Sequence, residues 1–274
     1  MPGDNPLLRH WQTEIRVFQK NFSLLNEQMN VEAIHDLRVA IKKLRSYFKL
    51  YAALFKKKNT EELFTGTKKL FSVLGRHRNI EMSKQLLLSF AGKNKQVLDP
   101  LLVYLQLLQD QISDYGRQVL QQYETKDLND LTNELEQDFQ DFNMEETLNK
   151  VKEIMTSSIE NIKRDLKHFK NRSHLIRKHL KDIFYWSKIF DDEVVFTKSQ
   201  IKTIDKILDL LGSIQDHEVL VTNLKYFRKN ILSGGLTEYD LIKKIETGVE
   251  KKKERLLERA NKMTEELMLK FHKN

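Results

Sequence analysis

Residues 34–45, with the sequence IHDLRVAIKKLR, place one histidine and several basic residues at intervals that suit one side of an α-helix. Residues 173–181, with the sequence SHLIRKHLK, repeat the same order. The leading histidines, His35 and His174, lie 139 residues apart, which is about half of the 274-residue chain. A basic helix that occurs twice at this separation predicts an internally duplicated helical protein.

In both segments the histidine is followed by Arg at +3 and by Lys at +7 and +14. Each residue advances by about 100° around an α-helix, so these positions form one stripe. The stripe residues are His35, Arg38, Lys42, Arg45 and Lys49 in the first copy, and His174, Arg177, Lys181 and Lys188 in the second. Leucines and isoleucines occupy the adjoining face, so each helix is expected to pack through that face and to present its cations at the border. Phe184 stands where the first copy has Arg45, so the second stripe should be weaker in its middle.

The composition favours long, well-solvated helices around a proper core. Hydrophobic residues make up 40% of the chain and charged residues 31%, with only 9 Gly and 3 Pro. There is no cysteine, which excludes disulfides, thiolate metal sites and a cysteine nucleophile. The sequence has neither a signal-peptide pattern at its start nor an apolar stretch of the roughly 18 residues that span a membrane. We therefore expect a soluble cytoplasmic protein without a membrane partner.

Apolar residues recur with a helical period along almost the whole chain, and no strand pattern is evident. Helices are expected at about 6–28, 31–56, 60–74, 78–91 and 95–124, and again at 145–170, 174–190, 197–211, 215–231 and 237–271. Asn30 and Ser173 are predicted to cap the starts of the two basic helices. Gly75, Gly92 and Gly212 are expected to end helices, and residues 233–235 form the clearest turn.

A second pair of landmarks supports the duplication. The Leu-Gly pair at Gly75 follows His35 by 40 residues, and the pair at Gly212 follows His174 by 38 residues. The predicted organisation is one domain, residues 1–274, made of repeats at about 6–124 and 145–271 that an acidic linker, 125–143, joins. The fold class is all-α: two bundles of about four to five helices each, related by a pseudo-twofold axis, with a basic groove between them.

The formal net charge of +8 favours anionic partners. Residues 35–58 hold eight Lys or Arg against one acid, and residues 163–181 hold eight against one. Like charges spaced three or four residues apart on a helix repel one another. The chain has 39 acidic residues that could have been interleaved here. Their absence suggests that an external anion neutralises the stripes, and the repetition of the same pattern is hard to attribute to solubility alone.

The same residues give little support to metal binding or catalysis. Glu32 and His35 have the Glu-x-x-His spacing of di-iron bundles, but the second copy has Asn171 at the matching position. The sequence has no glycine-rich phosphate loop, no GxSxG motif and no carboxylate cluster fit for Mg²⁺. We therefore predict no catalytic residue, no metal and no cofactor. His35 and His174 are better suited to donating hydrogen bonds to phosphate oxygens.

The first motif resembles the signature of the CHAD family, in which a His is followed by Arg-Val at +3 and +4, a basic pair at +7 and +8, and Arg at +10. Residues 174–185 resemble the family's second signature. Residues 74–78 and 211–216 resemble its Leu-Gly turns, so the resemblance extends over about residues 6–271. It implies two similar helical bundles with a basic groove or pore that binds inorganic polyphosphate, and association with polyphosphate granules.

The resemblance also implies which residues bind the polymer. Together with Lys188 from the stripe pattern, the predicted polyphosphate-binding residues are His35, Arg38, Lys42, Lys43, Arg45, Lys49, Arg76, Arg78, His174, Arg177, Lys178, Lys181 and Lys188. Lys42 and Lys43 replace the family's usual arginines, which keeps the charge but loses bidentate contacts. Asn79 and Phe184 replace a usual Asp and Arg. The triphosphatase motif Glu-x-Glu-x-Lys of some family members is absent, so a stand-alone binding module is expected.

Two other functions remain as alternatives. An RNA- or DNA-binding protein is disfavoured, because the stripes lack the interleaved exposed aromatic residues that stack on bases. A metal-dependent polyphosphate hydrolase or kinase is disfavoured, because the motif regions lack metal-binding carboxylates. The prediction from the sequence is therefore non-enzymatic binding of inorganic polyphosphate.

Overall fold

The computed structural model describes residues 5–57, 65–92, 95–139, 143–190, 195–232 and 237–272. Within these ranges all regular structure is helical, as predicted, and there is no strand. The α-helices are α1 (Pro6–Glu27), α2 (Val31–Leu54), α3 (Thr65–Ala91), α4 (Asp99–Gln121), α5 (Lys126–Asp138), α6 (Met144–Leu166), α7 (Phe169–Trp186), α8 (Lys198–Asn230) and α9 (Thr237–Leu269). Short 3-10 helices, η3 (Lys95–Leu98) and η4 (Lys270–His272), precede α4 and follow α9.

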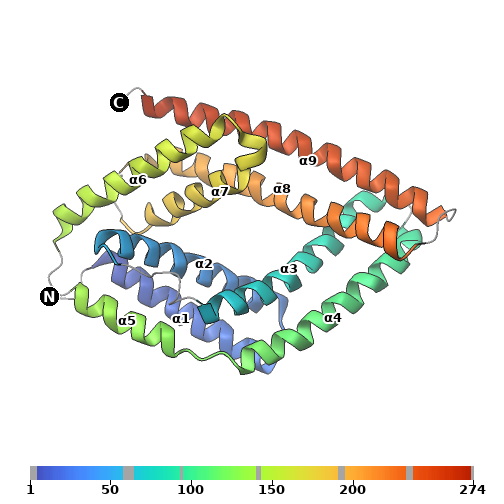
Figure 1. Cartoon of the computed structure of the whole chain (residues 1–274), viewed down its shortest axis with the longest axis horizontal. Coiled ribbons are helices and arrows are strands. Elements are labelled where there is room, and N and C mark those ends of the chain that lie inside the picture. Colours follow the sequence, from blue (N-terminus) through green and yellow to red (C-terminus); the bar gives the residue numbers. More distant parts are fainter. Residues whose placement is uncertain are drawn as a thin grey trace.

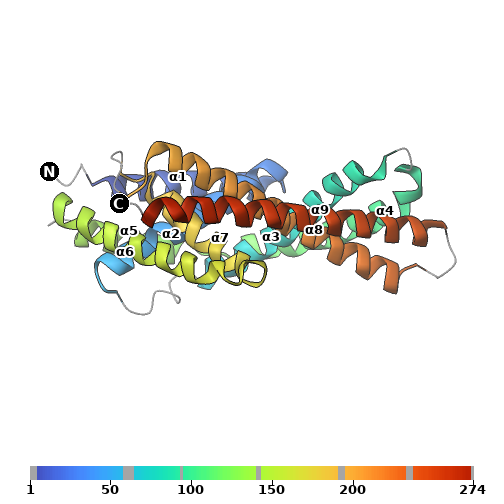
Figure 2. The same ribbon diagram turned by 90° about the horizontal axis from the view of Figure 1, so that it is seen from above.

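Neighbouring helices pack in pairs: α1 along α2, α3 along α4, α6 along α7 and α8 along α9. Figure 1 shows α6 to α9 along one side of the molecule and α1, α2 and α5 on the other. The two sides meet where α2 packs against α7 and where α3 packs against α8. Figure 2 shows that α3, α4, α8 and α9 extend together toward one end of an elongated molecule.

The apolar face of each basic helix lies in the core. Leu37, Ile41 and Leu44 of α2 are completely buried, and so are Ile176 and Leu180 of α7. These side chains belong to one continuous hydrophobic cluster to which both sides of the molecule contribute. Burial of this face fixes the rotation of each helix about its axis, and therefore fixes where the cationic stripe points.

The helix starts agree with the sequence in one case and differ in the other. Asn30 caps α2 as predicted, because its side-chain oxygen accepts hydrogen bonds from the backbone N–H groups of Glu32 and Ala33 at 2.8 and 3.1 Å. The prediction for Ser173 is wrong. Helix α7 already begins at Phe169, after His168, and Ser173 lies inside it.

Two of the three glycines expected to end helices do not do so. Gly92 follows α3 directly with a φ of 56°, a conformation that glycine adopts readily. Gly75 and Gly212 instead lie inside α3 and α8, so the helices expected at 60–74 and 78–91 form one helix, and those at 197–211 and 215–231 form another. Residues 60–64 and the turn at 233–235 are outside the described part of the chain.

Residues 125–143, predicted as an acidic linker, contain α5, which the sequence analysis did not predict. Its spaced leucines, Leu128, Leu131 and Leu135, are buried. The helix packs against α1, where the indole N–H of Trp11 donates to the Thr132 hydroxyl at 2.9 Å. The acidic residues of this stretch therefore form the outer face of an amphipathic helix.

A polar junction joins α2 to α7. The indole N–H of Trp186 donates to the backbone carbonyl of Ser46 at 2.8 Å, and the Ser46 hydroxyl donates to the buried Asp182 carboxylate at 2.9 Å. Lys49 also donates to Asp182. Since both basic stripes lie on these two helices, the junction holds the stripes against each other.

Candidate functional site

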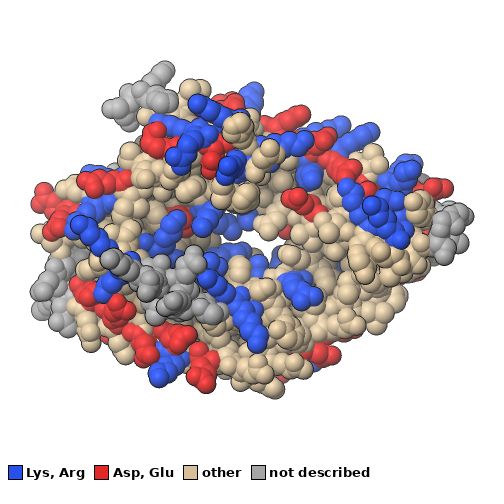
Figure 3. Space-filling view, in the orientation of Figure 1, with Lys and Arg blue, Asp and Glu red and all other residues tan. Residues whose placement is uncertain are grey.

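Two adjoining cavities lie between α2 and α7, with volumes of about 590 and 460 Å³. Lys42, Lys178 and Lys181 line both of them. The larger is further lined by Arg45, Ser46, Phe48, Lys49, Ala52, Ala53, Lys57, Lys68, Asp182 and Tyr185. The smaller is further lined by Arg38, Phe71, Ser173, His174, Arg177, Leu211, Ile214, Gln215 and Glu218. Figure 3 shows Lys and Arg side chains gathered around an opening at the centre of the molecule.

Among the described residues, Arg38 is held in place without a carboxylate. Its Nη1 donates to the backbone carbonyl of Phe71 at 2.7 Å, and its guanidinium lies over the Phe71 ring, 4.3 Å from the centroid. Gly75 makes this position available, since a Cβ atom there would lie 2.4 Å from Arg38 Nη1. This close approach explains a glycine in the middle of α3, where it costs the helix about 1 kcal/mol relative to alanine.

Arg177 of α7 is placed in a similar way. Its Nη1 donates to the side-chain oxygen of Gln215 at 2.9 Å, and a Cβ atom at Gly212 would lie 3.1 Å from its Nη2. The buried Arg177 Nε has no hydrogen-bond partner. The pairing of a stripe arginine with a helix glycine therefore occurs twice, once with α2 and α3 and once with α7 and α8.

The lysines of the two stripes meet between these arginines. Burial, the charge of Lys181 and the charges of the two arginines lower the pKa of Lys42 to about 7. Burial and the same arginines lower the pKa of Lys181 to about 8. Burial and Arg78 lower the pKa of Arg38 to about 10. We call Arg38, Lys42, Arg177 and Lys181 the cation cluster. The charges of its two arginines are close enough to disfavour the charged forms of its two lysines.

Among the described residues, the carboxyl groups near the cation cluster are fewer than the cations. Asp216 of α8 is near Lys42 and Arg177, but burial raises the pKa of its carboxyl group despite these cations. Asp182 lines the larger cavity and already accepts hydrogen bonds from Ser46 and Lys49. Glu218 is exposed at the edge of the smaller cavity. The described part of the site therefore carries a clear excess of positive charge.

The remaining predicted residues divide into those that line the cavities and those that do not. Arg45, Lys49, His174 and Lys178 line them. His35 and Arg78 lie nearby, where burial and the charge of Arg78 lower the pKa of His35. The protonated form of His35 is therefore disfavoured in the unliganded protein.

Three predicted residues point elsewhere. Lys43 forms an ion pair with the buried Glu14 of α1, at 2.6 Å. The ammonium group of Lys188 lies over the Phe184 ring, 4.0 Å from its centroid. Arg76 is exposed and does not line either cavity. The +14 position therefore reaches the cavities only in the first stripe, through Lys49.

Several lining residues were not predicted. Lys57 and Lys68 add positive charge to the larger cavity, although Lys57 is also paired with Glu134 and Asp138 of α5, at 2.8 and 2.7 Å. Tyr185 adds a hydroxyl group, and burial raises its pKa to about 12, so that it remains a neutral donor. Lys68 carries no signal in the sequence, because it lies outside both motifs.

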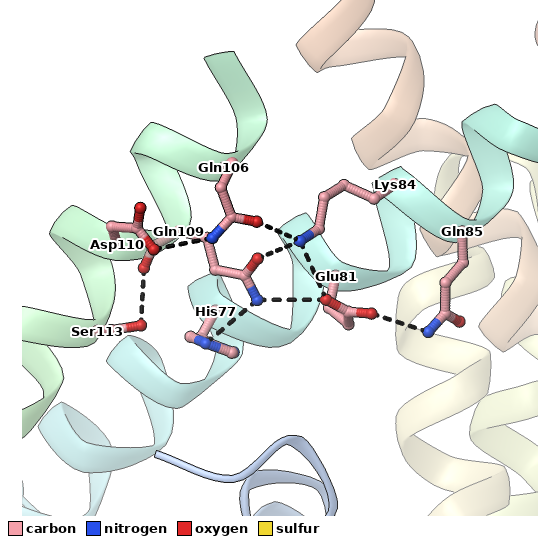
Figure 4. A network of polar contacts seen from close by, with 8 residues as sticks. All are labelled: His77, Glu81, Lys84, Gln85, Gln106, Gln109, Asp110 and Ser113. Carbon is pink, nitrogen blue, oxygen red and sulfur yellow. Dashed lines mark hydrogen bonds and ion pairs between the residues drawn. The ribbon is translucent and has the colours of Figure 1, made fainter. Parts of the chain in front are cut away.

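A second polar region lies between α3 and α4, and Figure 4 shows it in detail. Lys84 donates to the side-chain oxygens of Gln106, at 3.0 Å, and Gln109, and pairs with Glu81 at 3.4 Å. The amide nitrogen of Gln109 lies 3.3 Å from both Glu81 Oε2 and the ring of the buried His77. We call the eight residues of Figure 4 the α3–α4 network; they are His77, Glu81, Lys84, Gln85, Gln106, Gln109, Asp110 and Ser113.

The described residues form neither a metal site nor a membrane span. No three His, Asp or Glu side chains are grouped in a way that could hold a metal ion. None of the helices has the length and apolar character needed to cross a membrane.

Comparison with known proteins identifies the family. The family model described as the CHAD domain matches residues 9–225. The fold is similar to the crystal structure of the CHAD domain from the plant Ricinus communis, with a TM-score of 0.73 and 16% sequence identity over 95% of this chain and 90% of that one. The comparison with curated proteins gives no match. Because the family model spans most of the chain, the protein belongs to the CHAD family.

Proposed function

We propose that this protein binds inorganic polyphosphate without chemically transforming it, in the two cavities that the cation cluster joins, and that it does so at polyphosphate granules. Membership of the CHAD family supports a polyphosphate-related role. The observation that carries the proposal is the convergence of Arg38, Lys42, Arg177 and Lys181 from two helices on open cavities, with more cations than carboxylates among the described lining residues.

In the unliganded protein, the charges of the cation cluster repel one another. Burial and mutual repulsion lower the pKa values of its lysines, which means that the unliganded protein disfavours their charged forms. Phosphate oxygens reverse this balance, because they supply both negative charge and hydrogen-bond acceptors. Charge-assisted hydrogen bonds of this kind are about twice as strong as neutral ones.

The arrangement fits a polymer better than a single small anion. The two cavities share three lysines, and together their linings extend along α2 from Arg38 to beyond Lys49. One orthophosphate would neutralise only part of this surface. A chain with a charge on every phosphate can contact successive cations, and each contact releases counterions to solution.

The structure offers little to the two alternatives. Nucleic acid binding without sequence preference relies on exposed aromatic rings that stack on bases. Among the described lining residues, Phe48 is buried, Phe71 is covered by Arg38, and Tyr185 is half-buried. A metal-dependent hydrolase needs a group of free carboxylates next to the phosphates. Of the two described carboxylates that line the cavities, Asp182 is already bonded to Ser46 and Lys49, and Glu218 lies at the exposed edge of the smaller cavity.

Charge reversal at the centre of the site tests the proposal. In the double variant Lys42→Glu/Lys181→Glu, two attractive contacts worth about 1.5–3 kcal/mol each become repulsive, so binding of long-chain polyphosphate should weaken by about 100-fold or more. Lys202→Glu/Lys206→Glu is the matched control, with the same change in net charge on exposed positions of α8 outside both cavities. Titration calorimetry gives the affinity, and circular dichroism checks the helix content. If a helical Lys42→Glu/Lys181→Glu variant binds as tightly as the control, the assigned site is wrong.

Salt dependence tests whether the ligand is a polymer. With about five to eight phosphate contacts, the slope of log K against log salt should be roughly −3.5 to −5.6, at about −0.7 per neutralised charge of a single-stranded polyanion. Orthophosphate at matched ionic strength should compete poorly. A slope near −1, or equal affinity for orthophosphate, would indicate a pocket for one small anion.

A further inference from the structure

The cation cluster combines two kinds of cation that are held differently. Its arginines are fixed: Arg38 by the Phe71 carbonyl and Arg177 by Gln215. Its lysines have no such anchor. Among the described residues, neither Lys42 nor Lys181 has an acceptor within hydrogen-bonding distance or a carboxylate within ion-pair distance. Both ammonium groups therefore depend on solvent or on a ligand for their hydrogen bonds.

The charged groups around these two lysines come from four helices. Arg38 lies on α2 with Lys42, and Arg177 lies on α7 with Lys181. Helix α3 contributes Arg78, whose charge acts on Arg38. The neighbouring acids are Asp216 of α8, which acts on Lys42, and Asp182 of α7, which acts on Lys181. Most of these neighbouring charges are positive, so they favour the neutral forms of the two lysines. The arginines of the cluster keep their charge, because a guanidinium group does not readily lose a proton.

Resting on the proposed function, we propose that Lys42 and Lys181 take up protons from solution when polyphosphate enters the cavities, so that the ligand itself completes the charge of its binding site. The step is a proton transfer: each neutral amine forms one new N–H bond with a proton that leaves a buffer acid or a water-borne hydronium ion, and no bond between heavier atoms changes. The arginines provide the permanent charge that first attracts the polymer, and the lysines add the charge that responds to it.

The direction of the effect follows from the environment of the free site. With pKa values of about 7 for Lys42 and about 8 for Lys181, most of the Lys42 amines and about half of the Lys181 amines are neutral near pH 8. A phosphate oxygen beside each amine stabilises the charged form and returns its pKa toward the ordinary value near 10.5. Binding near pH 8 should then draw in about one proton at Lys42 and about half a proton at Lys181.

Lys43 is the natural internal control. It is the neighbour of Lys42 in the same helix, but its ammonium group pairs with Glu14 at 2.6 Å and does not line either cavity. Filling of the cavities therefore leaves the surroundings of this ammonium group unchanged. Lys43→Arg should leave both affinity and proton uptake unchanged.

Titration calorimetry in two buffers of different ionisation enthalpy measures the number of protons taken up. The ligand is long-chain polyphosphate, whose internal phosphates stay ionised near pH 8. The wild-type protein should take up about one to one and a half protons per occupied site. In Lys42→Arg/Lys181→Arg the charge is permanent, so binding should persist while at least two-thirds of the uptake disappears.

The outcomes separate this inference from the proposed function. Absence of binding in the wild type overturns both. If the wild type binds polyphosphate with the same heat in both buffers, proton coupling is wrong but the proposed function stands. The same holds if Lys42→Arg/Lys181→Arg takes up as many protons as the wild type. If that variant does not fold, the single variant Lys42→Arg should still lose more than half of the proton uptake.

A second measurement needs no variant. Uptake of one proton or more weakens polyphosphate binding by the wild type by about tenfold or more between pH 8 and 9. An affinity that does not change between these pH values contradicts the proposal.

Discussion

The cation cluster and the α3–α4 network differ in the partners of their charged side chains. In the cation cluster, four cations face one another, and the pKa values of Lys42 and Lys181 fall to about 7 and 8. In the α3–α4 network, Lys84 is surrounded by Glu81 and two glutamine oxygens (Figure 4). Glu81 is stabilised as well, because hydrogen bonds from Gln109 and Gln85 and the charge of Lys84 hold the pKa of its carboxyl group below its usual range, against the effect of burial.

The paired charges of the α3–α4 network are expected to stabilise the fold, whereas the like charges of the cation cluster are expected to bind a ligand. A polar group that is satisfied inside the protein contributes to stability, and its removal leaves partners unpaired. A charge surrounded by like charges does the reverse, because its removal relieves repulsion. The same mutation, lysine to methionine, should therefore have opposite consequences in the two regions.

The largest expected effect is on the free energy of unfolding of the unliganded protein at pH 7. Lys84→Met leaves Glu81 and Gln109 without their shared donor, and should cost about 1–3 kcal/mol. Lys42→Met removes a repelled charge, and should leave stability unchanged or raise it by a few tenths of a kcal/mol. Chemical denaturation in low-salt buffer free of phosphate measures both. Equal destabilisation by the two substitutions would show that Lys42 is a structural residue.

Affinity for polyphosphate should show the reverse order. Lys84→Met lies outside both cavities and should bind polyphosphate like the wild type once folded. Lys42→Met should bind about tenfold more weakly or worse, since a charge-assisted contact is worth at least about 1.5 kcal/mol. Lys84→Met should therefore be the less stable variant, and Lys42→Met the weaker binder. A general loss of folding could not produce this opposite order.

A smaller effect concerns acid and the buried His77 of the α3–α4 network. Burial lowers the pKa of His77, with Lys84 acting in the same direction and Glu81 opposing it. The folded protein therefore keeps the ring neutral at pH values where the unfolded chain, with a pKa near 6.5, takes up a proton. The stability that His77 contributes is present above pH 6.5 and is lost as the pH falls below it, by at most about 1.4 kcal/mol per pH unit.

Denaturation curves at pH 7 and pH 5.5 for the wild type and His77→Gln isolate this contribution. All groups other than residue 77 are common to both proteins, so their contributions cancel in the comparison. The wild type should lose more stability than His77→Gln over this range, by up to about 1 kcal/mol. Identical losses would mean that the Gln109 contact does not depend on a neutral imidazole ring.

Much of the fold could be predicted because helical periodicity and caps are local. The apolar faces of the two basic helices and the Asn30 cap follow directly from spacing and residue type. Helix α5 was missed because its acidic composition conceals three leucines spaced for one face, Leu128, Leu131 and Leu135. The acids are solvated, so composition alone favoured a linker.

The placement of the stripe residues could be predicted only in part. The stripe pattern puts Arg38, Lys42, Arg177 and Lys181 at the border of their helices, and the structure brings these four together. A helical wheel gives direction but not the identity of the facing element, so it could not show that Lys43 meets Glu14 on α1. It also could not show that Lys188 lies over Phe184.

The glycines illustrate the same limit and provide the smallest predicted effect. A glycine within a polar stretch usually ends a helix, yet Gly75 and Gly212 lie within α3 and α8 because an arginine of another helix occupies the space of the missing side chain. Unlike the α3–α4 network, the cation cluster positions its arginines through this close approach and through neutral acceptors rather than through carboxylates.

Alanine at the two glycines should therefore separate helix stability from arginine position. In Gly75→Ala the new Cβ atom would lie 2.4 Å from Arg38 Nη1, so the guanidinium must leave the Phe71 carbonyl. The helix gains about 1 kcal/mol from alanine and loses a hydrogen bond of similar worth, so stability changes little. Polyphosphate affinity should nevertheless fall by about threefold to tenfold, since Arg38 no longer occupies its place in the cavity.

Gly212→Ala is the matched comparison. There the Cβ atom would lie 3.1 Å from Arg177 Nη2, which a shift of a few tenths of an ångström relieves while the bond to Gln215 is kept. This variant should be more stable than the wild type by up to about 1 kcal/mol and should lose less affinity than Gly75→Ala. Thermal denaturation and polyphosphate titration of both variants measure the two quantities. Equal affinities for wild type, Gly75→Ala and Gly212→Ala would mean that the arginines reach the polymer without these glycines, and that the cluster is held by its hydrogen-bond acceptors alone.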